Sequence, residues 1–350
     1  MSSHSPTAVR NERRALLATI TVLLVAFGLS VAIGVGSVTL TPSSWIAGLQ
    51  RDSDASNREI IAAHARTTRA AMAVLAGFGL GVSGALLQAL YRNPLAGPSI
   101  TGVSQGAITA VIVWVTFGPA ATAENGTVVM ALVAIVGGSA SGLATYGISR
   151  LGGSVDPMRL ILIGVLLGGV LASATSFALL RAGERAPAII RWISGALNST
   201  SWDEVWIVAG GLALLAPFTL WCIPLGNALA LGDESAHAIG QSVPMARLAM
   251  LLTACALTAV SIARVGGLAF VGLVAPHLAR PRVGSDLRRL VPAAGLAGAG
   301  LVLIADGLAR NLRPSTLPLP FDTANNTLPA GLFLAVFGGL FFVRTIRRTA

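Results

Sequence analysis

Long apolar runs recur along the whole chain, and short polar segments separate them. Each run is close to the roughly 20 residues that an α-helix needs to cross about 30 Å of hydrocarbon. The pattern therefore predicts an all-α fold, a polytopic membrane helix bundle of about ten transmembrane helices. The predicted spans lie near residues 15–38, 68–91, 99–118, 127–149, 158–180, 205–226, 247–264, 267–281, 290–310 and 328–344.

The spans form a single transmembrane domain over residues 15–344, with short tails at residues 1–14 and 345–350. An even number of spans places both termini on the same side of the membrane. Arginines gather near both ends of the sequence, and basic segments next to a span stay preferentially in the cytoplasm. We therefore expect both termini to be cytoplasmic. The overall arginine bias between the two sides is weak, so the outer arginines need a further explanation.

Composition supports the membrane assignment. Hydrophobic residues make up 54% of the chain, charged residues 11%, and the mean hydropathy is +0.77, which excludes an ordinary soluble domain. The formal net charge of +10 comes from arginine, since the chain has no lysine. In a membrane protein this excess indicates charged loops and phospholipid headgroups, and no nucleic-acid-binding motif is present. We expect the lipid bilayer, and no nucleic acid, as a partner.

Glycines repeat at helical spacing in two of the predicted spans. Gly77, Gly81 and Gly84 lie in the second span, and Gly164 and Gly168 lie in the fifth. Small residues on one helix face let two backbones approach closely where no hydrophobic drive exists between helices. The pattern predicts a tightly packed bundle and indicates no particular substrate.

The chain carries no sequence motif for covalent chemistry. A phosphate-binding GxxxxGK[ST] loop, an HExxH metal site and a GxSxG nucleophile elbow are all absent, and no His/Cys/Asp/Glu cluster has metal-ligand spacing. Cys222 and Cys255 both lie in apolar runs, where a thiol packs as a small hydrophobe. We therefore predict no catalytic residue, no metal and no cofactor in this chain.

Two ionisable residues inside the spans remain candidates for transport. Asp306 is the only acid well inside a span, and such acids often lie on ion pathways; Arg310, one helical turn later, offers it a local partner instead. His277 has no acidic neighbour, and Arg280 disfavours its charged form, which favours a structural or interfacial role. An ion-coupled secondary transporter using Asp306 and His277 stays open as an alternative class.

Two polar segments have local signals of their own. Asn93-Pro94 can end the second span, because proline lacks a backbone donor and disfavours helical geometry in the residue before it. The loop 227–246 contains Gly232-Asp-Glu-Ser-Ala-His-Ala-Ile-Gly240, which predicts a short helix with an acid near its N-terminus and a glycine stop.

Five segments, in this order, resemble one family. They are RTTRAAMAVLAGFGLGVSGALLQALYRNPLAGPSITGVSQGA (66–107), RWISGALNSTSW (191–202), LGDESAHAIG (231–240), GGLAFVGLVAPHLAR (266–280) and LIADGLAR (303–310). The chain is similar to the binding-protein-dependent ABC permeases for iron–siderophores, haem and cobalamin.

The resemblance implies a type II ABC importer permease in the bacterial cytoplasmic membrane. Such a permease forms a homo- or heterodimer with a second permease subunit, binds two cytoplasmic ATPase subunits, and receives substrate from an extracytoplasmic substrate-binding protein. A ferric siderophore or related chelate is the expected cargo, with cobalamin or haem as the alternative. The chain itself is then a transport subunit and not an enzyme.

The resemblance also implies roles for particular residues. The loop 227–246 would couple to the ATPase, and the outer arginines would contact acidic residues of the binding protein. The residues implied for coupling are Gly232, Asp233, Glu234, Ala236 and Gly240. Those implied for docking are Arg66, Arg69 and Arg310. The residues that belong to the family motifs and have an implied structural role are Gln88, Asn93, Pro94, Gly102, Gly106, Pro276, His277, Arg280 and Asp306. We further expect the second, fifth and eighth spans to line the pathway.

The chain departs from the family pattern near its last span. A Glu-Leu-Pro-x-Gly motif is usual there, and this chain has Thr327-Leu-Pro-Ala-Gly331, without the acid. The preceding segment 311–327 is longer than usual, and a proline usual in the last span is missing after Gly338. These departures put contacts at the outer surface in doubt.

Overall fold

The computed structural model describes residues 42–50, 56–118, 126–151, 157–197, 200–311 and 328–349. Within these residues the chain is helical and contains no strand. The predicted all-α fold is therefore confirmed. The predicted first span at 15–38, the tail at 1–14 and most of the segment 311–327 lie outside the described residues. Of the tail predicted at 345–350, residues 345–349 continue helix α13 and only residue 350 is not described.

Each predicted span after the first coincides with a helix. The helices are α2 (Pro42–Gln50), α3 (Asn57–Leu90), α4 (Val103–Phe117), α5 (Gly126–Arg150), α6 (Pro157–Arg181), α7 (Ala186–Ile193), α8 (Trp202–Ala230), α9 (Asp233–Ala238), α10 (Val243–Ile262), α11 (Val271–Val283), α12 (Leu287–Asn311) and α13 (Ala330–Thr349). By length and composition, six described helices can cross a membrane: α3, α5, α6, α8, α10 and α12. Helix α4 and the first part of α13 are apolar but shorter.

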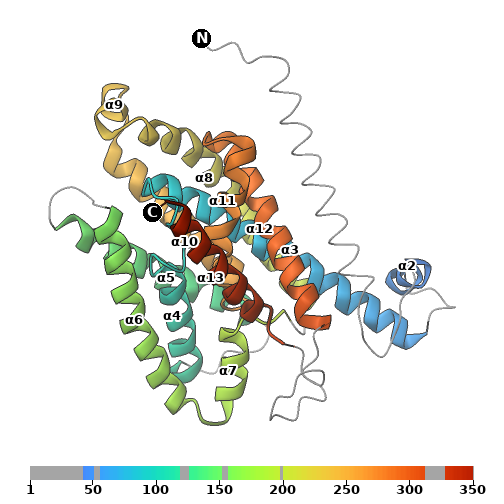
Figure 1. Cartoon of the computed structure of the whole chain (residues 1–350). Helices are drawn as coiled ribbons and strands as arrows, with labels where there is room; N and C mark the ends of the chain where they lie inside the picture. Colours follow the sequence, from blue (N-terminus) through green and yellow to red (C-terminus); the bar gives the residue numbers. More distant parts are fainter. Residues whose placement is uncertain are drawn as a thin grey trace, which may run out of the picture.

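Helix α3 starts well before the span predicted at 68–91. Ser56 accepts a hydrogen bond from the backbone N–H of Glu59, and the Glu59 carboxylate accepts one from the backbone of Ser56, so a capping box begins the helix. Hydropathy missed this polar first part because it reports only the apolar length. At 34 residues, α3 is longer than the bilayer core requires. Helix α2 packs beside this extension, away from the rest of the bundle (Figure 1).

Helix α3 is the centre of the bundle, with α12, α10, α11 and α8 packed around it (Figure 1). In its most apolar window, 78% of the residues are buried inside this chain. The predicted glycine face makes this possible: a Cβ at Gly81 would lie 2.1 Å from the carbonyl oxygen of Ala294 in α12. Neighbours in the same chain cover most of this second span, so only a small part of its surface is left to line a pathway. Helix α6, with 17% of its apolar window buried, is the most open span.

Pro276 explains a close contact between α3 and α11. A proline cannot donate to the carbonyl four residues earlier, which is that of Gly272. A Cβ added to Gly84 of α3 would lie 1.7 Å from that same carbonyl oxygen. The carbonyl that Pro276 leaves without its helical partner is therefore packed against a glycine, where the two backbones come together.

The bundle has two ends. At the end we call the α9 end, α3, α5, α8 and α11 finish and α10 and α12 begin. At the opposite end, which we call the arginine end, α3 and α8 begin and α10 and α12 finish. Figure 1 shows α9 at one extremity of the molecule, far from α2 and α7. At the arginine end, Gly331 of the variant motif contacts the turn that follows α7, because its backbone N–H donates to the Gly195 carbonyl over 3.2 Å.

Candidate functional site

The predicted short helix in the 227–246 loop is confirmed as α9. Gly232 precedes it with φ 111° and Gly240 follows it with φ 83°, both in the left-handed region that favours glycine. Ala236 is fully buried against the bundle, while Glu234 is exposed. The glycines therefore set the two ends of the helix, and Ala236 fixes which face packs inward.

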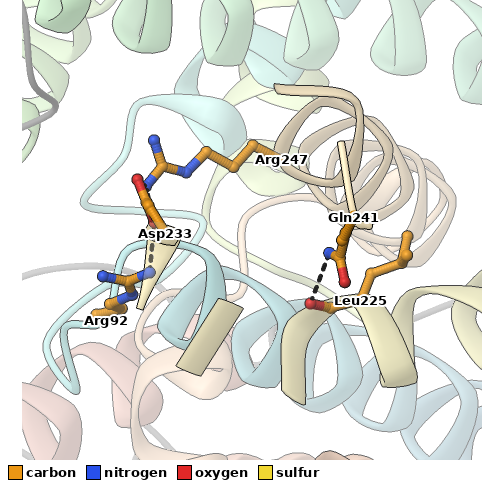
Figure 2. A network of polar contacts seen from close by, with 5 residues as sticks. All are labelled: Arg92, Leu225, Asp233, Gln241 and Arg247. Atoms are coloured by element: carbon orange, nitrogen blue, oxygen red, sulfur yellow. Dashed lines mark hydrogen bonds and ion pairs between the residues drawn. The ribbon is translucent and has the colours of Figure 1, made fainter. Parts of the chain in front are cut away.

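Asp233, the first residue of α9, joins two other helices. Its carboxylate pairs with Arg92, just after α3, at 2.5 Å and with Arg247 of α10 at 2.7 Å (Figure 2). Arg247 contacts both carboxylate oxygens, at 2.9 and 2.7 Å. Arg92 has φ 47°, an uncommon backbone conformation for a non-glycine residue. We call these three residues the Asp233 clamp.

Gln241 holds the other side of α9. Its backbone N–H donates to the carbonyl of Ala236, and its side-chain Nε2 donates to the carbonyl of Leu225 in α8 at 3.1 Å (Figure 2). With the Asp233 clamp, this contact ties the short helix to α3, α8 and α10. A displacement of α9 therefore acts on three spans at once.

A pocket of about 820 Å³ opens between α9 and the ends of α3, α5 and α10. Its lining is rich in arginine and includes a tyrosine ring. The lining residues are Arg92, Tyr146, Arg150, Asp233, Glu234, His237, Ala238, Val243, Pro244 and Arg247.

Three of the motif residues meet at the same end of the bundle. Gln88, 2% exposed, donates from Nε2 to the Leu273 carbonyl at 3.2 Å and accepts at Oε1 from Arg280 at 3.0 Å. Gln88 therefore joins α3 to α11. His277 packs its ring edge-to-face against Phe341 of α13, with 5.2 Å between ring centres. These contacts assign packing roles to Gln88, Arg280 and His277.

The remaining motif residues shape turns and helix contacts. The Asn93 side chain accepts from the backbone N–H of Leu95 at 2.8 Å, which closes the turn at Pro94. Gly102, with φ 78°, precedes α4, and its carbonyl accepts from Ser141 of α5 at 2.9 Å. A Cβ at Gly106 would lie 2.3 Å from that of Ser141. Both glycines thus allow α4 to pack closely on α5.

Asn227 and Asp286 are polar residues that the motifs did not indicate. Asn227 of α8 donates to the Asp286 carboxylate at 2.6 Å and accepts from the backbone N–H of Leu287, which links α8 to the start of α12. The backbone N–H of Arg288 bonds to the Asp286 carboxylate and lowers its pKa, and Asn227 and the nearby arginines add to this. An acid directly before an apolar run was the available signal, since it is typical of a helix N-cap.

The arginine end holds a buried charge cluster. Asp306 is fully buried; Arg69 contacts it at 2.7 Å and Arg310 at 3.3 Å. Arg66 is 9% exposed and close enough to Arg310 for their charges to interact. Two of the three arginines predicted for docking therefore pair with one carboxylate, and Arg66 lies near Arg310. The local Asp306–Arg310 pair is present, but Arg69, from the other end of the sequence, is the closer partner.

Asp306 and His277 do not form one relay. Arg69, which pairs with Asp306, and Gln88, which binds beside His277 in α11, are both on α3. They are 19 positions apart on this helix, which corresponds to about 28 Å. The two ionisable residues therefore lie at opposite ends of the bundle, and no proton or ion can pass directly between them.

Comparisons with known proteins agree with this architecture. The family model described as the FecCD transport family matches residues 22–348. The chain is 32% identical to the Fe(3+)-citrate import system permease protein YfmE of Bacillus subtilis (strain 168), covering 97% of each protein. It is 35% identical to the ferric enterobactin transport system permease protein FepG of Escherichia coli (strain K12), covering 88% of each. A solved metal-chelate type ABC transporter in an inward-facing conformation aligns with TM-score 0.74 and 24% identity, over 96% of this chain and 99% of that one.

The fold is that of a multi-pass membrane permease of type II ABC importer architecture. The chain belongs to the FecCD transport family. It is accordingly a transporter permease and not itself an enzyme.

Proposed function

We propose that this chain is half of a permease dimer that imports a ferric siderophore or related ferric chelate by ATP-driven alternating access. One observation carries the proposal: the Asp233 clamp and the arginine cluster lie at opposite ends of the same central helix, α3. From Arg69 to Leu90 the helix extends roughly 30 Å, the thickness of the hydrocarbon core. One rigid element thus connects two polar sites across the membrane.

The α9 end of this chain is the proposed contact for one of the two cytoplasmic ATPase subunits. Glu234 is exposed on α9, and the helix behind it is tied to three spans by the Asp233 clamp and Gln241. Movement of an ATPase against this helix would tilt those spans together. The basic C-terminal part of α13 supports a cytoplasmic assignment for this end, because Phe341 contacts His277 there and Arg344, Arg347 and Arg348 follow.

The arginine end is the proposed docking surface for an extracytoplasmic binding protein. Arg69 and Arg310 pair with Asp306 and Arg66 lies near Arg310, so these three arginines and one acid keep a net positive charge. Because these side chains are mostly buried, and Arg69 and Arg310 are held by Asp306, they present a fixed positive field and not long mobile contacts. Such a field steers and orients an acidic partner and adds modest affinity for each pair. This role explains why arginines lie on the outer side, although basic residues next to a span are usually cytoplasmic.

The cargo is proposed from the relatives. Their names include Fe(3+)-citrate and ferric enterobactin transport, while a cobalamin permease of Halobacterium salinarum is 30% identical over 83% of this chain and 74% of its own length. We therefore place ferric chelates first, with cobalamin or haem as the alternative cargo of the same machine.

Uptake by proteoliposomes tests this function. The chain is reconstituted with candidate ATPase subunits from the same genome, ATP is enclosed, and a binding protein loaded with an iron-labelled siderophore is added outside. We expect uptake that requires ATP and fails with a hydrolysis-deficient ATPase. Uptake that persists without ATPase and collapses with an uncoupler would favour an ion-coupled transporter and overturn the proposal. Repeating the assay with ferric citrate, haem and cobalamin identifies the cargo.

A further inference from the structure

Helices α4 and α6 share a group of polar side chains inside the bundle. The hydroxyls of Thr109 in α4 and Thr175 in α6 lie 2.9 Å apart, and Thr109 also donates to the Leu171 carbonyl of α6 at 3.1 Å. The side-chain Nε2 of Gln105 in α4 lies 3.4 Å from both hydroxyls. We call Gln105, Thr109 and Thr175 the amide cluster. It is separate from the Asp233 clamp and from the arginines around Asp306.

The amide cluster lies at the depth of the hydrocarbon core. Arg185, which follows α6, donates to the Val115 carbonyl of α4 at 3.0 Å, so the two helices finish together, at the end far from α9 (Figure 1). Thr109 lies six positions before Val115, which is about 9 Å along the helix. Gln105 lies one further turn inside. Both residues are therefore well within the roughly 30 Å that lipid tails occupy.

Gln105 is the member of the cluster that reaches the surface of the chain. Thr109 and Thr175 are buried, whereas Gln105 is only partly buried. Its Nε2 reaches two hydroxyls in the described part of the chain, both beyond the usual length of a hydrogen bond. An amide exposed to hydrocarbon without good partners costs several kilocalories per mole in principle, so lipid tails are an unfavourable cover for this position.

The open face of α6 beside the cluster also differs from a lipid-facing surface. Only 17% of the apolar window of α6 is buried in this chain, and an added Cβ at Gly169 would meet no atom within 4 Å. Small and hydroxyl-bearing residues predominate among the exposed positions there, including Ser173 and Ser176. The open face of α8 instead presents large apolar side chains such as Leu214 and Trp221, as lipid contact favours.

We propose that the amide cluster faces the translocation pathway, where the Gln105 amide donates hydrogen bonds to oxygen atoms of the passing chelate. This inference rests on the proposed import of ferric chelates. Helix α4 contains no charged residue, and α6 contains none between Arg159 and Arg181. An anionic, oxygen-rich cargo therefore meets only neutral donors along this face. Such contacts are weak enough for the cargo to leave again, which passage requires.

Cysteine labelling tests whether water reaches Gln105, and it needs no transport. Gln105→Cys in the assembled permease complex in nanodiscs, without ATP, is treated with a charged thiol reagent. We expect it to react, whereas the wild type should not, because Cys222 and Cys255 are both buried. Leu214→Cys, on the open face of α8, is the control and should stay unlabelled, since a thiol in hydrocarbon does not ionise. No reaction of Gln105→Cys would overturn the proposal and indicate lipid or a partner permease at this face.

Uptake of an iron-labelled chelate tests the contact with the cargo. Gln105→Leu keeps the approximate size of the side chain and removes the amide, and we expect uptake to fall about tenfold, as for loss of one or two hydrogen bonds. ATP hydrolysis stimulated by the binding protein and the unfolding temperature should stay at wild-type values. Thr219→Val, which removes a hydroxyl that bonds within α8, should leave uptake unchanged.

The outcomes separate this inference from the proposed function. Wild-type uptake in Gln105→Leu would overturn the cargo contact while ATP-driven import stands. Absence of ATP-dependent uptake in the wild-type complex would overturn both.

Discussion

Arg69 and Asp306 form an ion pair at 2.7 Å between α3 and α12, although 237 positions separate them in the chain. Asp306 is fully buried and Arg69 is 12% exposed at its side chain. Arg310 contacts the same carboxylate at 3.3 Å. One acid thus offsets part of the buried positive charge at the arginine end, and it joins α3 to α12, the most extensively packed pair of helices in the described bundle.

Replacing this acid should destabilise the chain strongly. Asp306→Asn leaves buried arginines without their counter-charge, a change that typically costs about 3–5 kcal/mol of unfolding free energy. Thermal unfolding of the purified chain in detergent measures the loss. Asp203→Asn, at an exposed acid of the same end, is the matched control and should change stability by less than about 0.5 kcal/mol. Equal unfolding free energies of the two variants would mean that the buried Arg69–Asp306 ion pair contributes nothing to stability.

Removing one docking charge should weaken binding-protein association in a salt-dependent way. Arg66→Gln is expected to lower the association rate several-fold at low ionic strength, with the difference shrinking as salt screens the field. Surface plasmon resonance with the permease in nanodiscs gives the rates. Arg58→Gln serves as control, because Arg58 is exposed at the same end and outside the cluster. Unchanged rates in Arg66→Gln at every salt concentration would remove the docking assignment.

Charge reversal at the exposed Glu234 of α9 should affect coupling and not folding. Glu234 makes no ion pair in the described residues, so Glu234→Arg should leave membrane insertion and unfolding temperature unchanged. If α9 contacts the ATPase, the same variant should lose most substrate-stimulated ATP hydrolysis. Wild-type stimulation in this variant would count against the coupling role of α9.

A single methyl group should disrupt the contact of α3 with α11. Gly84→Ala places a Cβ 1.7 Å from the Gly272 carbonyl oxygen, so the helices must separate, and we expect a loss of several kcal/mol or failure to fold. Gly168→Ala in α6 meets no atom within 4 Å and should be neutral or stabilise the helix by up to about 1 kcal/mol. The two variants are compared by the ratio of folded to aggregated protein after extraction from the membrane. Similar yields would contradict the close packing.

Local signals predicted local structure well. The glycines around 232–240 anticipated α9 because a left-handed residue at each end is a property of neighbouring positions. The spacing of Gly77, Gly81 and Gly84 anticipated a packing face for the same reason, although Gly168 of the fifth span packs against nothing within 4 Å.

Contacts between segments far apart in the chain could not be predicted from the sequence. Arg310 at i+4 was visible as a partner of Asp306, but Arg69 was not, because no periodicity joins α3 to α12. The Asp233 clamp likewise joins three separate segments through Arg92 and Arg247. The polar first part of α3 was not predicted, because hydropathy detects apolar residues and gives no signal for a polar turn that begins with a capping box.

The central claim is that docking of the binding protein at the arginine end stimulates the ATPase at the α9 end. Measuring ATP hydrolysis in proteoliposomes that carry the full complex tests this claim most directly. Substrate-loaded binding protein is added at the arginine end, and hydrolysis is measured at the α9 end. With Asp233→Asn, which releases Arg92 and Arg247 from α9, we predict that stimulation by the binding protein is lost while its docking affinity stays unchanged. Full stimulation in Asp233→Asn would contradict transmission through the clamp.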